Sequence, residues 1–262
     1  MNFTDNEENL NKAVSLIDQS NYIVLLTGAG ISTPSGIPDF RSQDSGLWMK
    51  NNPIEVASLS GFRSNPSIFY NWFHPLMETI MNATPNPAHL AIANLENNGL
   101  IKAVITQNID LFHQKAGSIN VLELHGSIKK FSCIKCGHES DCESSLIKDY
   151  LQSKLIPKCS HCNAPLKPSI ILYEEMLPAS VWEKAYDHSE KADLFIVVGT
   201  SLEVYPANLL PEVAISNNAK LIINTLSTTQ MDSVADVVLN LDVVDVWNYI
   251  IKRLDQENKK IL

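Results

Sequence analysis

Residues 27–42 read TGAGISTPSGIPDFRS and directly follow an apolar run at 22–26. A Gly-x-Gly turn after a buried strand is typical of nucleotide-binding α/β proteins, because glycine lets the backbone approach a pyrophosphate closely. Gly28 and Gly30 match this pattern, whereas Thr33 stands where dinucleotide-binding dehydrogenases have a third glycine. The two glycines alone are equally compatible with a tight turn.

The turn continues into a more specific segment, Gly36-Ile-Pro-Asp-Phe-Arg41. The guanidinium group of Arg41 can form two parallel hydrogen bonds to phosphate oxygens. Phe40 lies between the charged residues Asp39 and Arg41, which makes its ring a candidate lid over a ligand. This continuation favours a ligand-binding turn.

Short β-rich runs and helical patterns alternate along the rest of the chain. The expected strands lie at residues 22–27, 103–106, 121–124, 194–199, 221–224 and 237–239. The expected helices lie at residues 7–19, 67–81, 87–97, 179–190, 206–217 and 243–255. Most strand runs are nearly continuous Val, Ile and Leu, so they predict a doubly wound, parallel, Rossmann-like α/β sheet that is buried on both faces.

Two segments, 42–85 and 127–168, interrupt this alternation. We expect them to form a smaller inserted domain, with a loop and helical module in the first segment and a cysteine-bearing module in the second. The cofactor domain would then consist of residues 1–41, 86–126 and 169–262.

Composition limits the classes of function. The 262 residues include 45% hydrophobic ones and carry a net charge of -9, the opposite sign to that of a general binder of nucleic acid or anionic membrane. The chain contains no apolar run long enough to span a bilayer. Its first residues, MNFTDNEENLNK, do not resemble a secretory signal, so we expect a cytoplasmic protein.

Four of the five cysteines form two Cys-x-x-Cys pairs, Cys133 with Cys136 and Cys159 with Cys162. Four thiolates suit tetrahedral zinc, and a site closed by four sulfur ligands is structural. A redox pair is the alternative. We interpret the module as a zinc ribbon in which Cys142 is a spare thiol.

Polar residues follow several of the expected strands. Gln107, Asn108 and Asp110 come after 103–106, where ligands of open α/β sheets bind, although Asn108 or Asp110 could instead cap the next helix. His125 ends another apolar run and is either a structural histidine or a general base. The turn 199–201, Gly-Thr-Ser, could donate to phosphate or ribose or could be a plain polar turn.

Read together, these motifs resemble the sirtuins, the NAD-dependent protein lysine deacylases. The resemblance extends along nearly the whole chain and rests on GAGISTPSGIPDFRS at 28–42, TQNID at 106–110, LHG at 124–126, the two Cys-x-x-Cys pairs, GTSL at 199–202 and VYPA at 204–207. It implies NAD as co-substrate, a structural Zn²⁺ ion and acyl-lysine proteins or peptides as partners.

The resemblance also implies roles for single residues. His125 would be the catalytic base, Gln107, Ile109 and Asp110 would line the nicotinamide end of NAD, and Asn108 would order the ribose side. The other implied cofactor contacts are Gly28, Ala29, Gly30, Thr33, Asp39, Phe40, Arg41, Gly199, Thr200, Ser201, Asn224, Asp242 and Val243.

In the implied reaction the acyl oxygen attacks the ribose carbon that loses nicotinamide, and His125 accepts a ribose hydroxyl proton. Phe40 would exclude water from the cationic sugar. The products would be nicotinamide, free lysine and O-acyl-ADP-ribose.

The segment 167–178 resembles the sirtuin segment that pairs with an extended acyl-lysine peptide. The implied substrate contacts are Ile171, Tyr173, Glu174 and Val204. Glu174 stands where many sirtuins have glycine, and its acid could favour basic peptides or could be a solvated loop residue.

Desuccinylating sirtuins carry Tyr-x-x-Arg on one helix, whereas this chain has Tyr70 and Phe73, so we expect a neutral acyl group, acetyl first. The same two residues could equally be ordinary members of a helix core.

Other functions compete with deacylation. The same residues could support protein ADP-ribosylation, or the chain could be a non-catalytic NAD-binding module, although such a module needs neither His125 nor Asn108. A hydride-transferring enzyme ranks last because of Thr33. We expect a monomer that binds neither nucleic acid nor membranes directly.

Overall fold

The computed structural model describes residues 6–39, 46–141 and 145–258. Within these residues, a six-stranded parallel sheet has the order β3-β2-β1-β7-β8-β9. Its strands are β1 (Ile23–Thr27), β2 (Ile101–Thr106), β3 (Val121–Glu123), β7 (Leu194–Val198), β8 (Lys220–Asn224) and β9 (Val237–Leu239). This is the doubly wound order, in which the direction of winding reverses between β1 and β7, and it confirms the predicted fold class.

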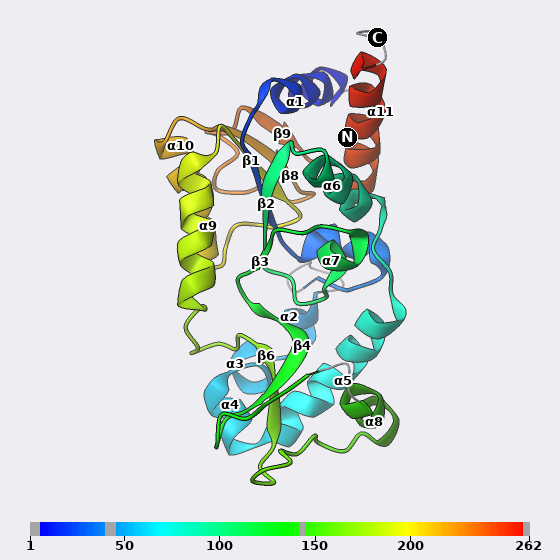
Figure 1. Cartoon of the computed structure of the whole chain (residues 1–262), viewed down its shortest axis with the longest axis vertical. Helices are drawn as coiled ribbons and strands as arrows, with labels where there is room; N and C mark the ends of the chain where they lie inside the picture. The colour runs from blue at the N-terminus through cyan, green and yellow to red at the C-terminus, as the bar shows by residue number, and fades with distance from the viewer. Residues whose placement is uncertain (1–5, 40–45, 142–144, 259–262) are drawn as a thin grey trace.

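Helices cover both faces of this sheet (Figure 1). One face packs against α1 (Glu7–Gln19), α6 (Pro87–Asn97) and α11 (Val243–Asn258), and the other against α9 (Ala179–Lys191) and α10 (Leu210–Ser216). The strands are buried because each lies between two helical layers. A further short helix, α7 (Phe112–Ala116), follows β2.

The helix predicted over 206–217 begins later than expected. A short 3-10 turn, η4 (Ala207–Leu209), precedes α10, which begins at Leu210. Pro211 has no N–H group, so it cannot donate the bond to Ala207 that a continuous α-helix needs, and it stands instead in the first turn of α10.

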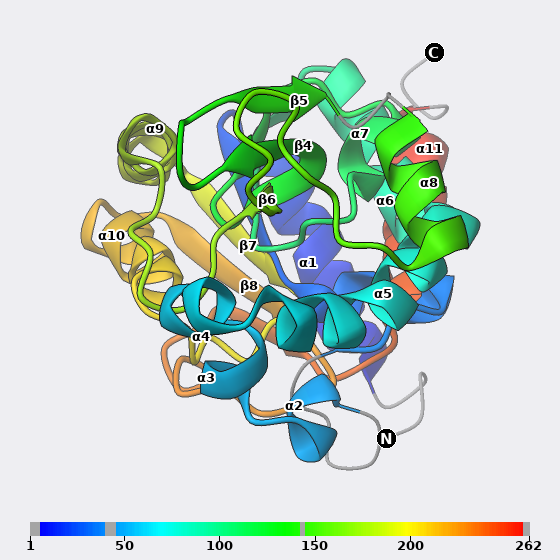
Figure 2. The ribbon, with the colours of Figure 1, turned by 90° about the horizontal axis from the view of Figure 1, so that it is seen from below.

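The two interrupting segments pack together at the lower end of the molecule (Figures 1 and 2). The first contains α2 (Leu47–Lys50), α3 (Pro53–Val56), α4 (Leu59–Ser64) and α5 (Pro66–Asn82). The second contains α8 (Ser145–Ser153) and a three-stranded antiparallel sheet of β4 (Gly126–Cys133), β5 (Glu139–Asp141) and β6 (Leu166–Ile170). The exact boundaries of the two domains remain a proposal.

The core of this lower region is aromatic. Tyr70 and Phe73 lie in it on α5, and the Tyr70 hydroxyl donates to the Leu166 carbonyl oxygen at 2.5 Å. Tyr150 packs edge-on against Tyr70. Both residues of the Tyr-x-x-Phe pair are therefore helix-core residues.

Among the described helices, none combines the length and the apolar character that crossing a membrane requires.

Candidate functional site

The turn after β1 lies against the turn after β7, where the sheet reverses its winding. The Gly30 N–H donates to the Gly199 carbonyl at 2.8 Å, and the Gly28 N–H donates to Val198 at 3.0 Å. A Cβ on Gly30 would come within 2.8 Å of the Gly199 Cα, and one on Gly28 within 2.6 Å of the Thr200 Cβ. These glycines are required by the close approach of two loops, which lie at the carboxyl ends of β1 and β7, where ligands of open α/β sheets bind.

Gly199 is constrained in a second way. Its φ of +63° is in the left-handed region, and a Cβ there would lie 2.2 Å from the Ile31 nitrogen. Its N–H donates to the Asn224 carbonyl at the end of β8. The turn at 199–201 is therefore more tightly determined than a plain polar turn.

Asn108 and Asp110 form one hydrogen-bonded group with Ser32. The Asn108 side-chain amide donates to the Gly28 carbonyl at 3.0 Å and to the Ser32 hydroxyl at 3.2 Å. The Ser32 hydroxyl donates to the Asp110 carboxylate at 2.7 Å. Asp110 also accepts from the N–H of Phe112, the first residue of α7, so it satisfies one donor of that helix as well as belonging to this group. Burial raises the pKa of Asp110, despite the hydrogen bonds that stabilise its charge.

Two buried histidines, His89 and His113, pack beside the group formed by Ser32, Asn108 and Asp110. His89 accepts from the Asn86 N–H at its Nδ1 atom, so its Nε2 carries the proton and faces Ser32 at 3.5 Å. His113 contacts the Thr27 hydroxyl at 2.9 Å through Nε2. The two rings meet edge to face, with centroids 5.0 Å apart. Burial lowers the pKa of His89 to about 4 and that of His113 well below its usual value.

Gln107 connects this group to His125. The Gln107 side chain donates to the Thr200 hydroxyl at 3.2 Å, and its backbone carbonyl lies 3.0 Å from Nδ1 of His125. A carbonyl oxygen can only accept, so Nδ1 carries the proton of the neutral ring and Nε2 carries the lone pair. This is the tautomer that a general base at this position requires.

His125 lies where the chain passes from the large sheet to the small one. Its carbonyl accepts from the Ile171 N–H at 2.8 Å, on the segment that leads back. Gly126 follows with φ +65°, and a Cβ there would lie 2.1 Å from the Ser169 carbonyl oxygen. The two crossing segments therefore touch beside the candidate base.

The four paired cysteines converge in the small sheet. Their sulfur atoms all lie within 4.8 Å of one another, with Cys133 and Cys162 at 3.4 Å and Cys136 and Cys159 at 3.6 Å. Four ligands about 2.3 Å from a tetrahedral centre would lie roughly 3.8 Å apart, so the cluster has the dimensions of a zinc site. The described residues contain no other group of three or more candidate ligands.

Each cysteine pair lies on the same type of turn. In the first, the Gly137 N–H donates to the Cys133 carbonyl, and Gly137 has φ +73°. In the second, the Asn163 N–H donates to the Cys159 carbonyl, and Asn163 has φ +59°. Both Cys-x-x-Cys pairs therefore end in a turn closed by a residue in the left-handed region. The rings of His138 and His161 stack beside them, 3.8 Å apart, and take no part in the cluster.

The pKa values of Cys133 and Cys136 move in opposite directions. The Cys136 backbone N–H is the main cause that lowers the pKa of Cys133 to about 6. At Cys136 the His138 N–H favours the thiolate, but the neighbouring sulfurs raise its pKa to about 12. A metal ion bound between the four sulfur atoms would balance the charge of thiolate ligands.

Comparison with known proteins identifies the chain. A sequence model described as the Sir2 family matches residues 28–206. The chain belongs to the Sir2 family. This confirms the expected sirtuin membership.

Curated relatives in the Sir2 family match most of the chain. NAD-dependent protein deacylase 2 of Archaeoglobus fulgidus is 47% identical over 232 residues, which are 88% of this chain and 90% of that protein. NAD-dependent protein deacetylase of Thermotoga maritima is 42% identical over 232 residues, which are 88% of this chain and 93% of that protein.

Solved Sir2 structures match the fold closely. One, described as Sir2 with p53 peptide and NAD+, has a TM-score of 0.85 and 40% identity, and the alignment covers 93% of this chain and 98% of that one. Another holds deacetylated p53 peptide and 3'-O-acetyl ADP ribose, with a TM-score of 0.87 and 39% identity over the same shares.

Three other predicted cofactor contacts of this Sir2 chain take part in contacts within the large domain. Asn224 ends β8, but it is buried and its amide donates to the carbonyls of Leu239 and Leu241. Asp242 caps α11 by accepting from the Val244 N–H at 2.8 Å. Val243 is buried in the core. These contacts hold β9 and α11 in place, and a cofactor role for the three residues stays a prediction.

Some predictions concern residues near or beyond the described ones. Phe40, Arg41 and Cys142 lie outside the described residues. The Asp39 carbonyl accepts from the Leu47 N–H at 2.9 Å. Thr33 donates to the Gly30 carbonyl at 3.0 Å and so reinforces the turn in which Ala29 lies. Ser201 is half-buried beyond β7.

The peptide-pairing segment predicted from sequence bonds to residues 57–59, where α3 ends and α4 begins. The Tyr173 N–H donates to Ala57 at 2.9 Å, and the Tyr173 carbonyl accepts from Leu59 at 3.0 Å. Ile171 is bound to His125 as described, and Val204 is half-buried between β7 and η4. Substrate roles for these residues remain predictions.

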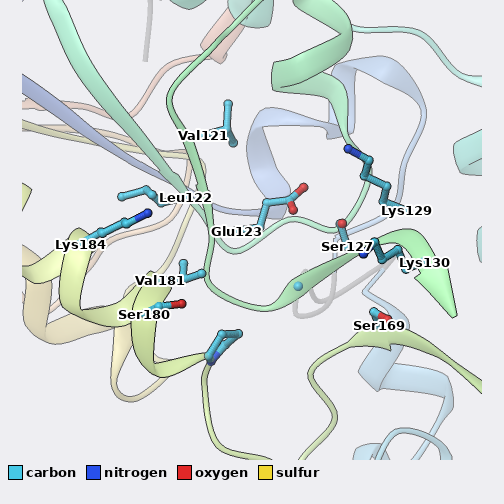
Figure 3. A pocket seen from close by; sticks show the side chains of 12 residues that line it. Val121, Leu122, Glu123, Ser127, Lys129, Lys130, Ser169, Ser180, Val181 and Lys184 are labelled. Carbon is cyan, nitrogen blue, oxygen red and sulfur yellow. The ribbon is translucent and has the colours of Figure 1, made fainter. Parts of the chain in front are cut away.

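A cavity of about 400 Å³ opens elsewhere, between α9 and β4 (Figure 3). Ser180, Val181 and Lys184 lie on one side of it, and Lys129 and Lys130 on the other. None of the single residues predicted to contact NAD or peptide lines it, but Ser169 and Pro178 belong to the segment 167–178 and Gly126 follows His125. The cavity therefore borders the segments that meet beside His125.

Sequence reasoning missed the supporting residues of the site, which are Thr27, Ser32, Asn86, His89, Thr106 and His113. His89 was the most detectable of them, because it is a lone histidine on the apolar face of a well-predicted helix. Nothing in the sequence indicated that it reaches Ser32.

Proposed function

We propose that this chain is an NAD-dependent protein lysine deacetylase or deacylase. It transfers the acyl group from lysine to ADP-ribose and releases nicotinamide. Its relatives carry this activity in their names, and a similar Sir2 structure holds deacetylated peptide together with acetyl ADP ribose. That pair of products favours deacylation over ADP-ribosylation of the protein substrate.

The observation that carries the proposal is the bond between His125 and the Gln107 carbonyl. It leaves Nε2 as the basic atom of a neutral ring at the carboxyl ends of β3 and β2. A binding module would have no need to set the tautomer of a histidine at this position. We assign to His125 the acceptance of a ribose hydroxyl proton.

The other residues at this edge of the sheet would bind and orient NAD, which when bound supplies the ADP-ribosyl group that accepts the acyl. The loops containing Gly28, Gly30 and Gly199 would let the backbone approach its phosphates closely, although the N–H groups of these three glycines are themselves bound within the protein. Asn108 and Asp110 present polar groups from a fixed network with Ser32. Arg41 and Phe40 keep their predicted roles in phosphate binding and water exclusion.

The four-cysteine cluster would hold a structural Zn²⁺ ion. It has a closed set of four sulfur donors in a module that contributes none of the proposed catalytic groups. The acyl group would be neutral, acetyl first. We also propose a cytoplasmic monomer that binds neither nucleic acid nor membranes, in keeping with its net charge of -9.

The test combines the protein with NAD and an acetyl-lysine peptide and follows both the peptide mass and nicotinamide. His125→Ala is the informative variant. His188→Ala is its matched control, since His188 contacts the Tyr22 hydroxyl before β1, at the other end of the sheet. Loss of one acetyl group with equal nicotinamide release, absent in His125→Ala and retained in His188→Ala, is the expected result.

Two results would contradict this proposal. Nicotinamide release with the acetyl group still in place would mean ADP-ribosylation or NAD hydrolysis. An inactive wild-type protein that also ignores longer neutral acyl chains would favour the binding module.

A further inference from the structure

We propose that Glu174 is a positioning residue for the acyl-lysine peptide. Its carboxylate, by binding Ser60, holds residue 174 in the backbone conformation that the peptide pairs with. This inference rests on the proposed function, because it assumes that the segment 171–175 binds peptide.

The backbone at Glu174 is in a conformation that an L-residue avoids. Its φ is +74°, in the left-handed region, where glycine is the residue without steric cost. Glutamate has no short side chain to hydrogen-bond its own backbone, as asparagine does there. Something outside the residue must therefore stabilise this geometry.

Ser60 of α4 provides that stabilisation. One carboxylate oxygen of Glu174 accepts from the Ser60 N–H at 2.8 Å, and the other accepts from the Ser60 hydroxyl at 2.8 Å. Both bonds are charge-assisted, and together they fix the orientation of the carboxylate. The acid is thus bound to its own protein, and it is not held ready for a basic side chain of a peptide.

Glu175, the next residue, binds the segment to a different part of the protein. Glu175 accepts from Lys167 at 2.9 Å and from the Leu172 N–H at 2.8 Å, and its own N–H donates to the Leu172 carbonyl at 3.0 Å. Lys167 is buried. Two adjacent glutamates therefore bind in different directions, one to the small sheet and one to α4.

Between the Glu174–Ser60 and Glu175–Lys167 contacts, only a short stretch of backbone is left to pair with a peptide. The N–H and C=O groups of Tyr173 are already bound to Ala57 and Leu59. No described residue bonds the backbone N–H or C=O of Glu174, so the segment can offer these groups to an incoming strand. Their direction is set by the φ of residue 174, and so by the bond to Ser60.

Four substitutions distinguish the effect of the anchor, by which we mean the two hydrogen bonds between Glu174 and Ser60, from the effect of the left-handed backbone conformation. Glu174→Ala loses the anchor and keeps the steric penalty, Glu174→Gly loses both, and Glu174→Gln can keep both bonds to Ser60. Ser60→Ala loses one bond of the two. Glu190→Ala, an exposed acid on α9, is the control for loss of a surface charge.

The main readout is the Kd of a labelled acetyl-lysine peptide, followed by anisotropy, together with KM and kcat for each variant. We expect Glu174→Ala to raise the peptide Kd and KM about five- to tenfold, with kcat and the KM for NAD changed less than about twofold. Glu174→Gly and Ser60→Ala should lie between Ala and wild type, and Glu174→Gln should match wild type. Amide hydrogen exchange of residues 172–175 and 59–61 should become faster in Glu174→Ala. In Glu174→Gln it should stay as in wild type.

A comparison of peptides with basic and with neutral flanking residues tests the alternative that the Glu174 carboxylate binds a basic side chain of the peptide. Under this inference the ratio of their kcat/KM values is equal in wild type and Glu174→Gln. A fall of that ratio in Glu174→Gln would overturn it, as would an unchanged peptide Kd in Glu174→Ala. A wild-type protein that binds peptide but does not turn it over would contradict the proposed function alone.

Discussion

The Nδ1 atom of His125 and the backbone carbonyl of Gln107 are joined by a 3.0 Å hydrogen bond across the ends of β3 and β2. Asparagine can place an N–H group where Nδ1 stands, but it has no base to replace Nε2. We expect His125→Asn to keep the melting temperature while kcat falls by about 10²- to 10⁴-fold. His125→Ala should lose activity equally and also lose the bond. Substantial turnover by His125→Asn would show that this histidine is not the base.

Removal of the Asn108 amide should weaken cofactor use more than stability. Asn108→Ala deletes the donors to Gly28 and Ser32, and two part-buried bonds of this kind contribute about 1–3 kcal/mol together. We expect a higher KM for NAD and a lower kcat in steady-state kinetics. Asn97→Ala is the control, because its one long bond to Gly117 is exposed. Equal effects of the two variants on KM would refute a cofactor role for Asn108.

Glycine substitutions should separate steric contact from backbone strain. Gly36 has φ +87° and open space around its Cβ position, so Gly36→Ala should cost only the left-handed penalty of about 1–2 kcal/mol. Gly199→Ala adds a clash with the Ile31 nitrogen and should destabilise by roughly 1–3 kcal/mol more. Denaturant unfolding measures both. Similar values for the two variants would mean that the loops can move apart.

Metal removal should destabilise the lower region. We expect about one zinc ion per chain by elemental analysis, retained in Cys142→Ser and lost in Cys133→Ser. Cys133 belongs to the cluster, whereas Cys142 stands outside both Cys-x-x-Cys pairs of the sequence. A strong chelator should lower the melting temperature of wild type. Full stability of a metal-free preparation would contradict a structural role.

Acid should destabilise the protein through its buried histidines. The pKa of His89 in the folded protein is about 4, so between about 6.5 and 4 the unfolded chain binds a proton that the folded one does not. The free energy of unfolding therefore falls as pH falls through this window, by up to about 3 kcal/mol from His89. His113 acts in the same direction. The raised pKa of Asp110 acts in the opposite direction.

Unfolding at a series of pH values measures this slope. His89→Gln cannot titrate and should flatten it, while His74→Gln serves as the control at a part-buried site. An equal slope in His89→Gln and wild type would assign the acid sensitivity to other groups.

The large sheet could be predicted from sequence because its signals are local. Nearly continuous Val, Ile and Leu runs mark strands that are buried on both faces, and all six formed. The three short helices α2, α3 and α4 were missed because none exceeds six residues and none completes an amphipathic pattern. A zinc ribbon was predicted for the cysteine module, but its individual strands were not located, because β4 pairs with β6 across the whole module.

The site was predictable to a similar degree. Polar residues at strand ends could be selected by position alone, and Asn108, Asp110 and His125 do come to the expected edge. Their partners could not be selected, because Ser32, His89 and the Gln107 carbonyl reach them only through tertiary contacts. Glu174 was recognised as unusual, but its partner Ser60 lies in a helix that the sequence did not indicate.

The contact between Gly30 and Gly199 makes two distant positions a single steric unit. A methyl group on either residue would occupy the space of the other loop, so the first substitution already forces the loops apart. A second methyl group would then enter the gap that the first substitution has already opened between the two loops. The double variant Gly30→Ala and Gly199→Ala should therefore lose less stability than the sum of the single variants, and each glycine is a constraint on its partner more than on its own turn.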